Sequence, residues 1–270
     1  MKYIRLTFSY LTKNWWRMLI PLLPIAVCAG FFIEPYESAS ALYDVAVKRP
    51  NGFDEIAKVF HLIPTWQEVL FTLLTIVVGA VFISYSFIAV YRHFRTGKFS
   101  IRTPLPYINS GILPVLKIIL IITASVVLYR VVIVFVIVLF NMMLSALHVS
   151  YVVTMVFVYV LVIAGCLSGT VLLSTSILVF PQMYVYGYSL VEAWKGMTNM
   201  ITEPKKLFVP IIVPMLLLVL ANYVFILTGA HFAIVVSVRS VLYLIVLAYY
   251  IVLAQTIMFA ESGFERRDMR

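Results

Sequence analysis

Charged residues are scarce in this 270-residue chain: they make up 11% of the sequence, whereas hydrophobic residues make up 63%. A water-soluble domain of this size cannot bury so much apolar surface, but a lipid bilayer accepts it. The scarcity of charge therefore excludes an ordinary soluble protein and predicts an integral membrane protein.

Cysteine, histidine and acidic residues are too few or too scattered for most catalytic sites. The two cysteines, Cys28 and Cys166, lie in apolar stretches without the spacing of a metal or redox site. No pair of the four histidines has the spacing of a zinc or haem site. The long apolar stretches contain no Asp or Glu, and the phosphate-binding motif of ATPases is absent. We therefore expect no enzyme activity, no metal and no cofactor.

Long apolar runs are what the sequence has in abundance. Six of them cover 18–33, 69–91, 113–141, 151–180, 207–228 and 234–260. About 20 helical residues cross the ~30 Å hydrocarbon core of a bilayer, whereas barrel strands alternate and are about half as long. The predicted fold is all-α: a polytopic bundle of six transmembrane helices in a single domain over 1–270.

Basic residues are distributed unevenly between the connections. The predicted outer connections, 34–68, 142–150 and 229–233, hold only Lys48, Arg49 and Lys58. The opposite segments hold Lys2, Arg5, Lys13, Arg17, Arg92, Arg95, Lys98, Arg102, Lys195, Lys205, Lys206, Arg266, Arg267 and Arg270. This bias predicts that both termini are cytoplasmic. The net charge of +9 is interpreted as a topology signal and as a source of contacts with anionic lipid headgroups, not as a sign of nucleic-acid binding.

Amphipathic segments are predicted beside the spans. Apolar residues recur at helical spacing within 53–62, which predicts a helix on the outer surface or a lid on the span tops. The first, third and fifth spans begin in the same way. Each follows a surface segment, at 3–14, 104–111 and 189–201 respectively, and has a proline in its first turns. This predicts three repeat units of a surface helix and a span pair, namely 1–92, 93–182 and 183–270. The alternative is that every inward-facing hairpin begins in this way.

Arg130 is the most unusual polar residue because it lies near the middle of 113–141. A mid-membrane arginine costs at least ~2.5–3.5 kcal/mol on insertion scales unless it has a partner. The functional interpretation is that Arg130, with Arg239, marks an outward-facing site for an anion or a lipid phosphate. In the structural interpretation Glu68 pairs with Arg239, and Arg130 bonds to hydroxyls of the fourth span: Ser168, Thr170, Ser174 or Thr175. The sequence leaves both interpretations open.

A small-residue face lies in the fourth span. Gly165 and Gly169 are four residues apart, which predicts close packing between helices. The Gly-Cys-Leu-Ser-Gly run also resembles a serine-hydrolase turn, but no histidine lies at the same depth to act as a base. We therefore favour packing over catalysis at this position.

Three segments carry a family resemblance: FSYLTKNWW at 8–16, RHFRTGK at 92–98 and SLVEAWK at 189–195. They resemble bacterial six-span proteins that are grouped with the membrane domain of glycerophosphoryl diester phosphodiesterases. In that family the hydrolase is a separate barrel domain, for which this chain has no residues left. The resemblance implies a bacterial plasma-membrane protein concerned with export or lipid-linked transport, and it supplies no catalytic residue.

Together these observations predict a transporter, or the membrane component of a transport or export system, for an anionic or lipid-like substrate. Its expected partners are membrane lipids, including anionic headgroups, and other membrane proteins or further copies of the chain. The alternative is a non-catalytic scaffold or lipid-binding subunit of a membrane complex. An intramembrane enzyme is a third, disfavoured alternative.

Overall fold

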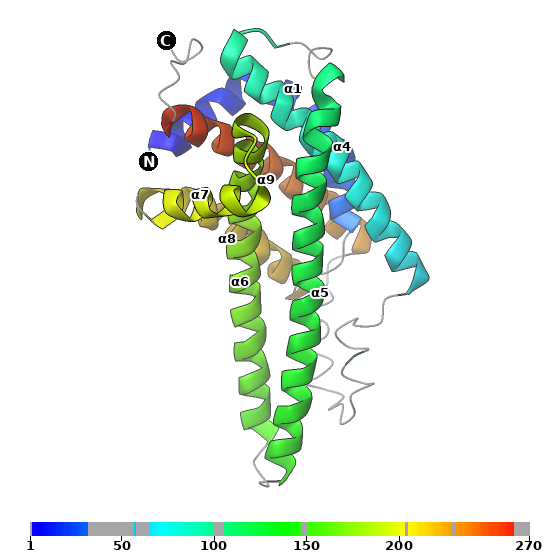
Figure 1. Cartoon of the computed structure of the whole chain (residues 1–270). Coiled ribbons are helices and arrows are strands. Elements are labelled where there is room, and N and C mark those ends of the chain that lie inside the picture. The colour runs from blue at the N-terminus through cyan, green and yellow to red at the C-terminus, as the bar shows by residue number, and fades with distance from the viewer. Residues whose placement is uncertain are drawn as a thin grey trace.

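The computed structural model describes residues 2–31, 57, 65–99, 105–146, 151–202, 205–227 and 231–261, and among them it contains helices and no strand. The long helices are α1 Lys2–Phe31, α4 Trp66–Thr96, α5 Ile108–Ala146, α6 Tyr151–Tyr186, α7 Leu190–Thr202, α8 Lys205–Leu227 and α9 Phe232–Glu261 (Figure 1). A short 3-10 helix, η1 Leu105–Tyr107, leads into α5. The prediction of an all-α fold is confirmed.

The described part of each of the six predicted apolar stretches lies on a helix. Five stretches of the described helices are long and apolar enough to cross a membrane: Lys2–Phe31, Trp66–Thr96, Ile108–Phe140, Leu167–Tyr186 and Ala233–Ala260. On α8 the described apolar stretch is shorter, Val209–Ala221. The helices therefore indicate a membrane-embedded protein, and the sixth span stays a prediction.

Helix α1 begins earlier than the predicted span and bends at Asn14. Asn14 has φ −126° and ψ 21°, which is not helical, and its side-chain Nδ2 donates to the carbonyl of Tyr10 at 3.3 Å. The bend separates the basic N-terminal turns from the part that contains Pro21 and Pro24. The predicted boundary between surface segment and span falls at this bend, and the surface position itself stays a prediction.

Helix α4 has well-defined ends. At its start, the Thr65 hydroxyl accepts from the Glu68 N–H at 3.3 Å, and the Glu68 carboxylate accepts from the Thr65 N–H at 2.6 Å. This reciprocal cap satisfies N–H groups that have no helical partner. At its end, Gly97 has φ +70°, a conformation that glycine adopts without steric cost, and its N–H donates to the His93 carbonyl at 2.9 Å. The chain then turns toward η1 and α5.

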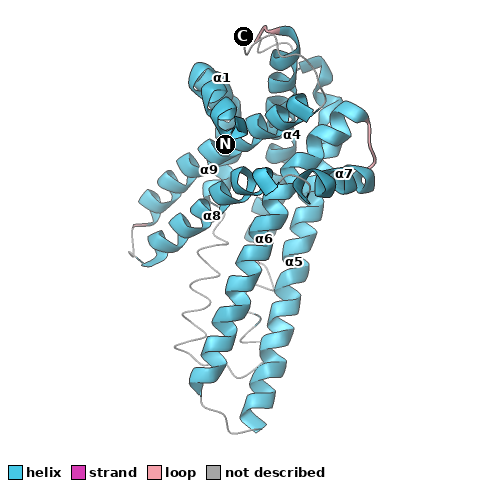
Figure 2. Ribbon diagram, turned by 90° about the vertical axis from the view of Figure 1, so that its left-hand side faces the viewer, coloured by secondary structure: helices cyan, strands magenta, loops and turns pink. Residues whose placement is uncertain are grey.

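Helices α5 and α6 form a long antiparallel hairpin that extends well beyond the other helices (Figures 1 and 2). The two helices have 39 and 36 residues, so each is roughly 55 Å long at 1.5 Å per residue. Near the turn, the rings of Phe140 and Phe157 stack with centroids 3.5 Å apart. Both helices exceed the length that a bilayer core requires, as the sequence predicted.

The core centres on α9, which packs most extensively against α1 and also contacts α4, α6 and α8. Every residue from 248 to 259 is buried. Gly30 of α1 allows a close approach: a Cβ there would overlap Ser240 Oγ and lie 3.0 Å from the Val236 carbonyl oxygen. Tight contact between these helices therefore requires a residue without a side chain at position 30.

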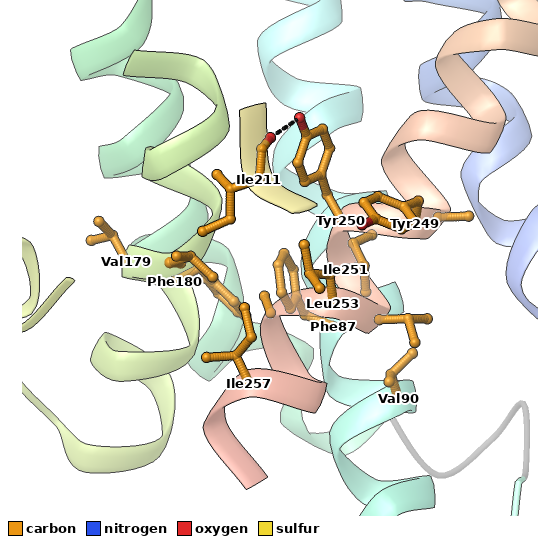
Figure 3. Packing of buried hydrophobic residues seen from close by; sticks show 14 of the residues in the cluster. Phe87, Val90, Val179, Phe180, Ile211, Tyr249, Tyr250, Ile251, Leu253 and Ile257 are labelled. Carbon is orange, nitrogen blue, oxygen red and sulfur yellow. Dashed lines mark hydrogen bonds between the residues drawn. The ribbon is translucent and has the colours of Figure 1, made fainter. Parts of the chain in front are cut away.

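Two adjacent tyrosines of α9 bond to the backbone of α8. Pro214 has no N–H, so the carbonyl of Pro210 cannot receive its helical hydrogen bond. The Tyr249 hydroxyl donates to that carbonyl at 3.0 Å, and the Tyr250 hydroxyl donates to the Ile211 carbonyl at 2.5 Å (Figure 3). The Tyr249 hydroxyl of α9 thus compensates for a proline in α8, and the Tyr250 hydroxyl adds a second hydrogen bond between the two helices.

Helix α7 crosses the end of α6 at a steep angle (Figures 1 and 2). Ala193 and Met197 are buried, whereas Val191, Glu192 and Lys195 are exposed. Helix α7 covers the predicted segment 189–201 except Ser189, and the position of this segment at a membrane surface stays a prediction. The predicted outer helix at 53–62 lies outside the described residues apart from Ala57. The division into three repeat units also stays a prediction.

Candidate functional site

Aromatic contacts gather the ends of four helices at one end of the bundle. Ring centroids are 4.8 Å apart for Tyr10 and Phe94, 5.4 Å for Phe94 and Phe259, and 5.7 Å for Tyr91 and Tyr184. These contacts join the first turns of α1 to the last turns of α4, α6 and α9. We call this region the basic end, because it carries the basic turns of α1 and α4 that the sequence placed on one side.

A pocket of about 580 Å³ opens at the basic end between α4, the start of α5 and the end of α6. Its described lining consists of two arginines, three tyrosines, two hydroxyl residues and a methionine: Tyr91, Arg92, Arg95, Thr96, Tyr107, Ser110, Met183 and Tyr184. No Asp or Glu is among these described lining residues. We call it the basic aromatic pocket.

The two arginines are held against tyrosine rings. The guanidinium carbon of Arg92 lies 3.4 Å from the ring centroid of Tyr107. Arg95 Nη1 donates to the Tyr91 hydroxyl at 3.1 Å. These contacts restrict the orientation of both cations, and a guanidinium with five N–H donors can bind a further acceptor beside such a contact. Both arginines also lie in the last two turns of α4, where the helix dipole favours positive charge.

Hydroxyl groups fix the opposite wall of the pocket. Ser110 Oγ donates to the Tyr107 carbonyl at 2.6 Å, and Tyr184 lines the same pocket. Gly111 brings this turn close to α4, since a Cβ there would lie 2.8 Å from Ile88 Cδ1. The start of α5 is therefore seated firmly against α4, which holds Tyr107 over Arg92.

This arrangement is suited to binding an anion. Two guanidinium groups and several hydroxyls surround one hollow, and arginine recognises phosphate and carboxylate oxygens through paired hydrogen bonds. Among the described residues, no group of three or more His, Cys, Asp or Glu is placed to hold a metal ion. His93 lies next to Arg92 in sequence but is bonded to the Tyr10 hydroxyl at 2.6 Å and does not line the pocket.

The predicted site residues Arg130 and Arg239 lie elsewhere. Arg130 is partly exposed on α5, which packs against α4 and α6. Arg239 is 2% exposed on α9, whose main neighbour is α1. Neither residue lines the basic aromatic pocket. Their proposed role as one anion site stays a prediction.

Most of the predicted partners of these arginines make other hydrogen bonds in the structure. Glu68 caps α4 through Thr65. Ser174 donates to the Thr170 carbonyl at 2.5 Å, and Thr175 donates to the Val171 carbonyl at 2.7 Å. The stacked pair Phe140 and Phe157 sets the register of the antiparallel hairpin, which puts Ser168 at about the depth of Arg130. Ser168 is thus the predicted partner that this register favours.

The predicted packing face at Gly165 and Gly169 makes no close contact at its second glycine. A Cβ at Gly169 would meet no atom of the described chain within 4 Å. The close approaches found in the structure are at Gly30, Gly111 and Gly196 instead. The predicted close packing of helices at Gly165 and Gly169 stays a prediction.

Sequence reasoning identified Arg92 and Arg95 only as topology markers and did not assign a role to Tyr184. The available signal was weak: basic and aromatic residues alternate near 91–95, and Tyr107 and Ser110 follow soon after a turn. Comparison with protein-family models, with curated proteins and with solved structures found no match. The fold and the pocket therefore define the class on their own: a helical, membrane-embedded protein with a basic aromatic pocket at one end.

Proposed function

We propose that the protein is a transporter, or the membrane component of a transport system, and that it receives an anionic, phosphate-bearing substrate at the basic aromatic pocket. The observation that carries this proposal is the pairing of Arg92 and Arg95 with tyrosine rings in a hollow whose described lining has no acid. Such a lining attracts an anion, and its aromatic walls offer apolar contact to the rest of an amphiphilic molecule.

The charge bias of the connections supports a cytoplasmic position for the basic end. In that orientation the pocket takes its substrate from the cytoplasmic face or from the inner leaflet. We further propose that the membrane is a bacterial plasma membrane, in keeping with the resemblance of the three segments described above, and that the protein has no catalytic activity of its own.

Binding to the pocket can be tested with a soluble phospholipid analogue. The protein is placed in nanodiscs of phosphatidylcholine and titrated with dihexanoyl phosphatidic acid in a calorimeter. Hydrogen bonds to charged groups are worth ~1.5–3 kcal/mol each, so Arg92→Gln and Arg95→Gln should each weaken binding about tenfold or more. Arg5→Gln, an exposed basic residue of α1 outside the pocket, is the matched control and should bind normally. Equal binding by all three variants would refute the pocket as the anion site.

Transport requires a separate measurement. Proteoliposomes of phosphatidylcholine with a trace of fluorescently labelled phosphatidylglycerol report translocation as the fraction of label that dithionite reaches. We expect translocation with the wild-type protein and its loss with Arg92→Gln. Binding without translocation would favour the alternative, a lipid-binding subunit of a membrane complex. Competition by inorganic phosphate would indicate that a free anion, and not a headgroup, is the natural ligand.

A further inference from the structure

A second hollow lies between α1 and α4 and differs in character from the basic aromatic pocket. It has a volume of about 380 Å³, and most of its described lining is apolar. The residues that matter are Trp16, Arg17, Ile20, Val81, Phe82 and Tyr85. We call it the α1–α4 groove.

The groove runs along the two helices because its lining residues are spaced by helical turns. On α1, Trp16 and Arg17 lie one turn before Ile20, and on α4 the lining residues 81, 82 and 85 also span about one turn. Trp16 is 44% exposed and Ile20 is 66% exposed. The groove therefore opens sideways on a surface of the bundle that the apolar spans turn toward lipid.

One cation marks one end of this apolar groove. Arg17 Nη1 donates to Asn14 Oδ1 at 3.3 Å, and its guanidinium carbon lies 5.1 Å from the Trp16 ring and 5.4 Å from the Phe99 ring. These contacts hold the cation where the bend at Asn14 joins the predicted span.

We infer that the α1–α4 groove holds one anionic phosphoglyceride of the surrounding bilayer, with its phosphate at Arg17 and one acyl chain along Ile20, Val81 and Phe82. The charge and the apolar lining together select this occupant. A free anion gains nothing from the apolar lining, and an uncharged hydrocarbon leaves the cation without its counter-ion. The inference rests on membrane embedding alone and does not depend on the basic aromatic pocket.

The four tryptophans of the chain allow a direct test, because brominated acyl chains quench nearby indole fluorescence. Trp15→Phe, Trp66→Phe and Trp194→Phe together leave Trp16 as the reporter in the groove. The matched control keeps Trp15, an exposed neighbour on α1 outside the described lining, and replaces Trp16 with Phe. Each protein is reconstituted in phosphatidylcholine vesicles that contain increasing fractions of dibrominated phosphatidylglycerol or dibrominated phosphatidylcholine.

We expect Trp16 to be quenched at a roughly five-fold lower fraction of brominated phosphatidylglycerol than of brominated phosphatidylcholine, the gain that one interfacial cation gives toward an anionic lipid. Trp15 should show no such preference. Arg17→Gln should abolish the preference of Trp16 for phosphatidylglycerol, and Val81→Phe, which extends a larger side chain into the groove, should reduce quenching by both lipids. The thermal stability of each variant is measured alongside.

Three results would overturn the inference. Equal quenching of Trp16 and Trp15 by both lipids would mean that only ordinary boundary lipid reaches the groove. Persistence of the preference in a stably folded Arg17→Gln protein would remove the cation from the site. Protection of Trp16 that rises with the density of protein in the vesicles would assign the groove to a second copy of the chain. Arg92→Gln should leave the quenching of Trp16 unchanged, so this test and that of the proposed function fail independently.

Discussion

Helices α5 and α9 are both predominantly apolar, yet they lie in different surroundings. In the 18-residue apolar stretch of each helix, 17% of the α5 residues are buried inside the protein, against 61% of the α9 residues. The more apolar of the two is α5. Its middle exposes Val127, Leu128 and Val132, whereas every residue of α9 from 248 to 259 is covered. Hydrophobicity therefore indicates that a helix enters a membrane and does not decide whether protein or lipid covers it.

Packing and buried hydrogen bonds explain the difference. Lipid tails are as apolar as leucine, so the hydrophobic effect does not drive helices together inside a bilayer. Helix α9 has specific contacts instead: the close approach at Gly30 and the tyrosine hydroxyls that bond to α8. The half of the α5–α6 hairpin nearer its turn has the stacked pair Phe140 and Phe157, which joins only those two helices.

The largest loss of stability is expected from a substitution that breaks the α1–α9 contact. Gly30→Val forces a side chain against Ser240 and the Val236 carbonyl, and overpacking of this kind costs typically 1–3 kcal/mol, so we expect a loss of about that size. Gly169→Val is the matched control on α6, where a Cβ meets no described atom within 4 Å, and it should be nearly neutral. Thermal unfolding in detergent, followed by size-exclusion chromatography, measures both. If Gly169→Val in a bilayer were as harmful as Gly30→Val, another chain would cover that face.

The next effect tests the hydrogen bonds between α8 and α9. Tyr249→Phe leaves the Pro210 carbonyl buried without a donor, which should cost about 1–3 kcal/mol. In a Pro214→Ala background the new N–H can satisfy that carbonyl, so the same tyrosine change should cost clearly less. A double-mutant cycle of unfolding free energies measures this coupling. Equal costs in the two backgrounds would contradict the compensation of Pro214 by Tyr249.

Arg130→Met tests the sparsely covered helix α5 and is expected to change stability little. Replacing a charge in an apolar setting with an apolar side chain is often neutral or stabilising, so we expect a change within about 1 kcal/mol. If Arg130 marks an anion site, this stable variant should lose lipid association and translocation. If Arg130 is structural, it should stay active while Ser168→Ala or Thr175→Ala destabilises the bundle. Full activity of stable Arg130→Met would exclude the anion-site interpretation.

The smallest effect concerns the exposed cap of α7. The Ser189 hydroxyl, and then the Ser189 N–H, hydrogen-bond the Glu192 carboxylate and lower its pKa. Because the folded pKa is lowered, the cap contributes stability above the ordinary pKa of Glu and loses it as the pH falls through the lowered value. Amide-exchange protection in the first turn of α7 should decline over that range and should not depend on pH in Glu192→Gln. Loss of protection across the whole bundle instead would point to global acid unfolding.

Much of the fold could be predicted from the sequence because spans in lipid need long apolar helices. The six apolar stretches predicted the helices to within a few residues at most ends, and the predicted end of the surface segment at residue 14 coincides with the bend in α1. The N-terminal turns of α1 were harder to join to the first span, because a basic segment and an apolar span look like separate elements in sequence. Hydropathy did not predict which helices would pack against one another.

The basic aromatic pocket was not predicted from the sequence. The sequence predicted an anion site at Arg130 and Arg239, because a charge inside an apolar run is conspicuous in sequence, and that site stays a prediction. The basic aromatic pocket is assembled from Arg92, Tyr107 and Tyr184, which are separated in sequence and come together only when α5 and α6 fold back beside α4. In sequence, arginines at the end of a span look like ordinary topology signals. Only the tertiary structure shows that a tyrosine ring contacts Arg92.

By itself, the sequence determined an all-helical, membrane-embedded protein. Unpaired backbone polar groups are costly in lipid, and a long apolar run pairs them within itself by forming a helix. The tertiary structure decided which apolar helix is covered by protein, which glycines permit close approach and which tyrosine satisfies the carbonyl that Pro214 leaves open. It also decided that Arg92 and Arg95 share a hollow while Arg17 lies at the end of another. These outcomes depend on contacts between residues far apart in the chain, and hydropathy does not encode such contacts.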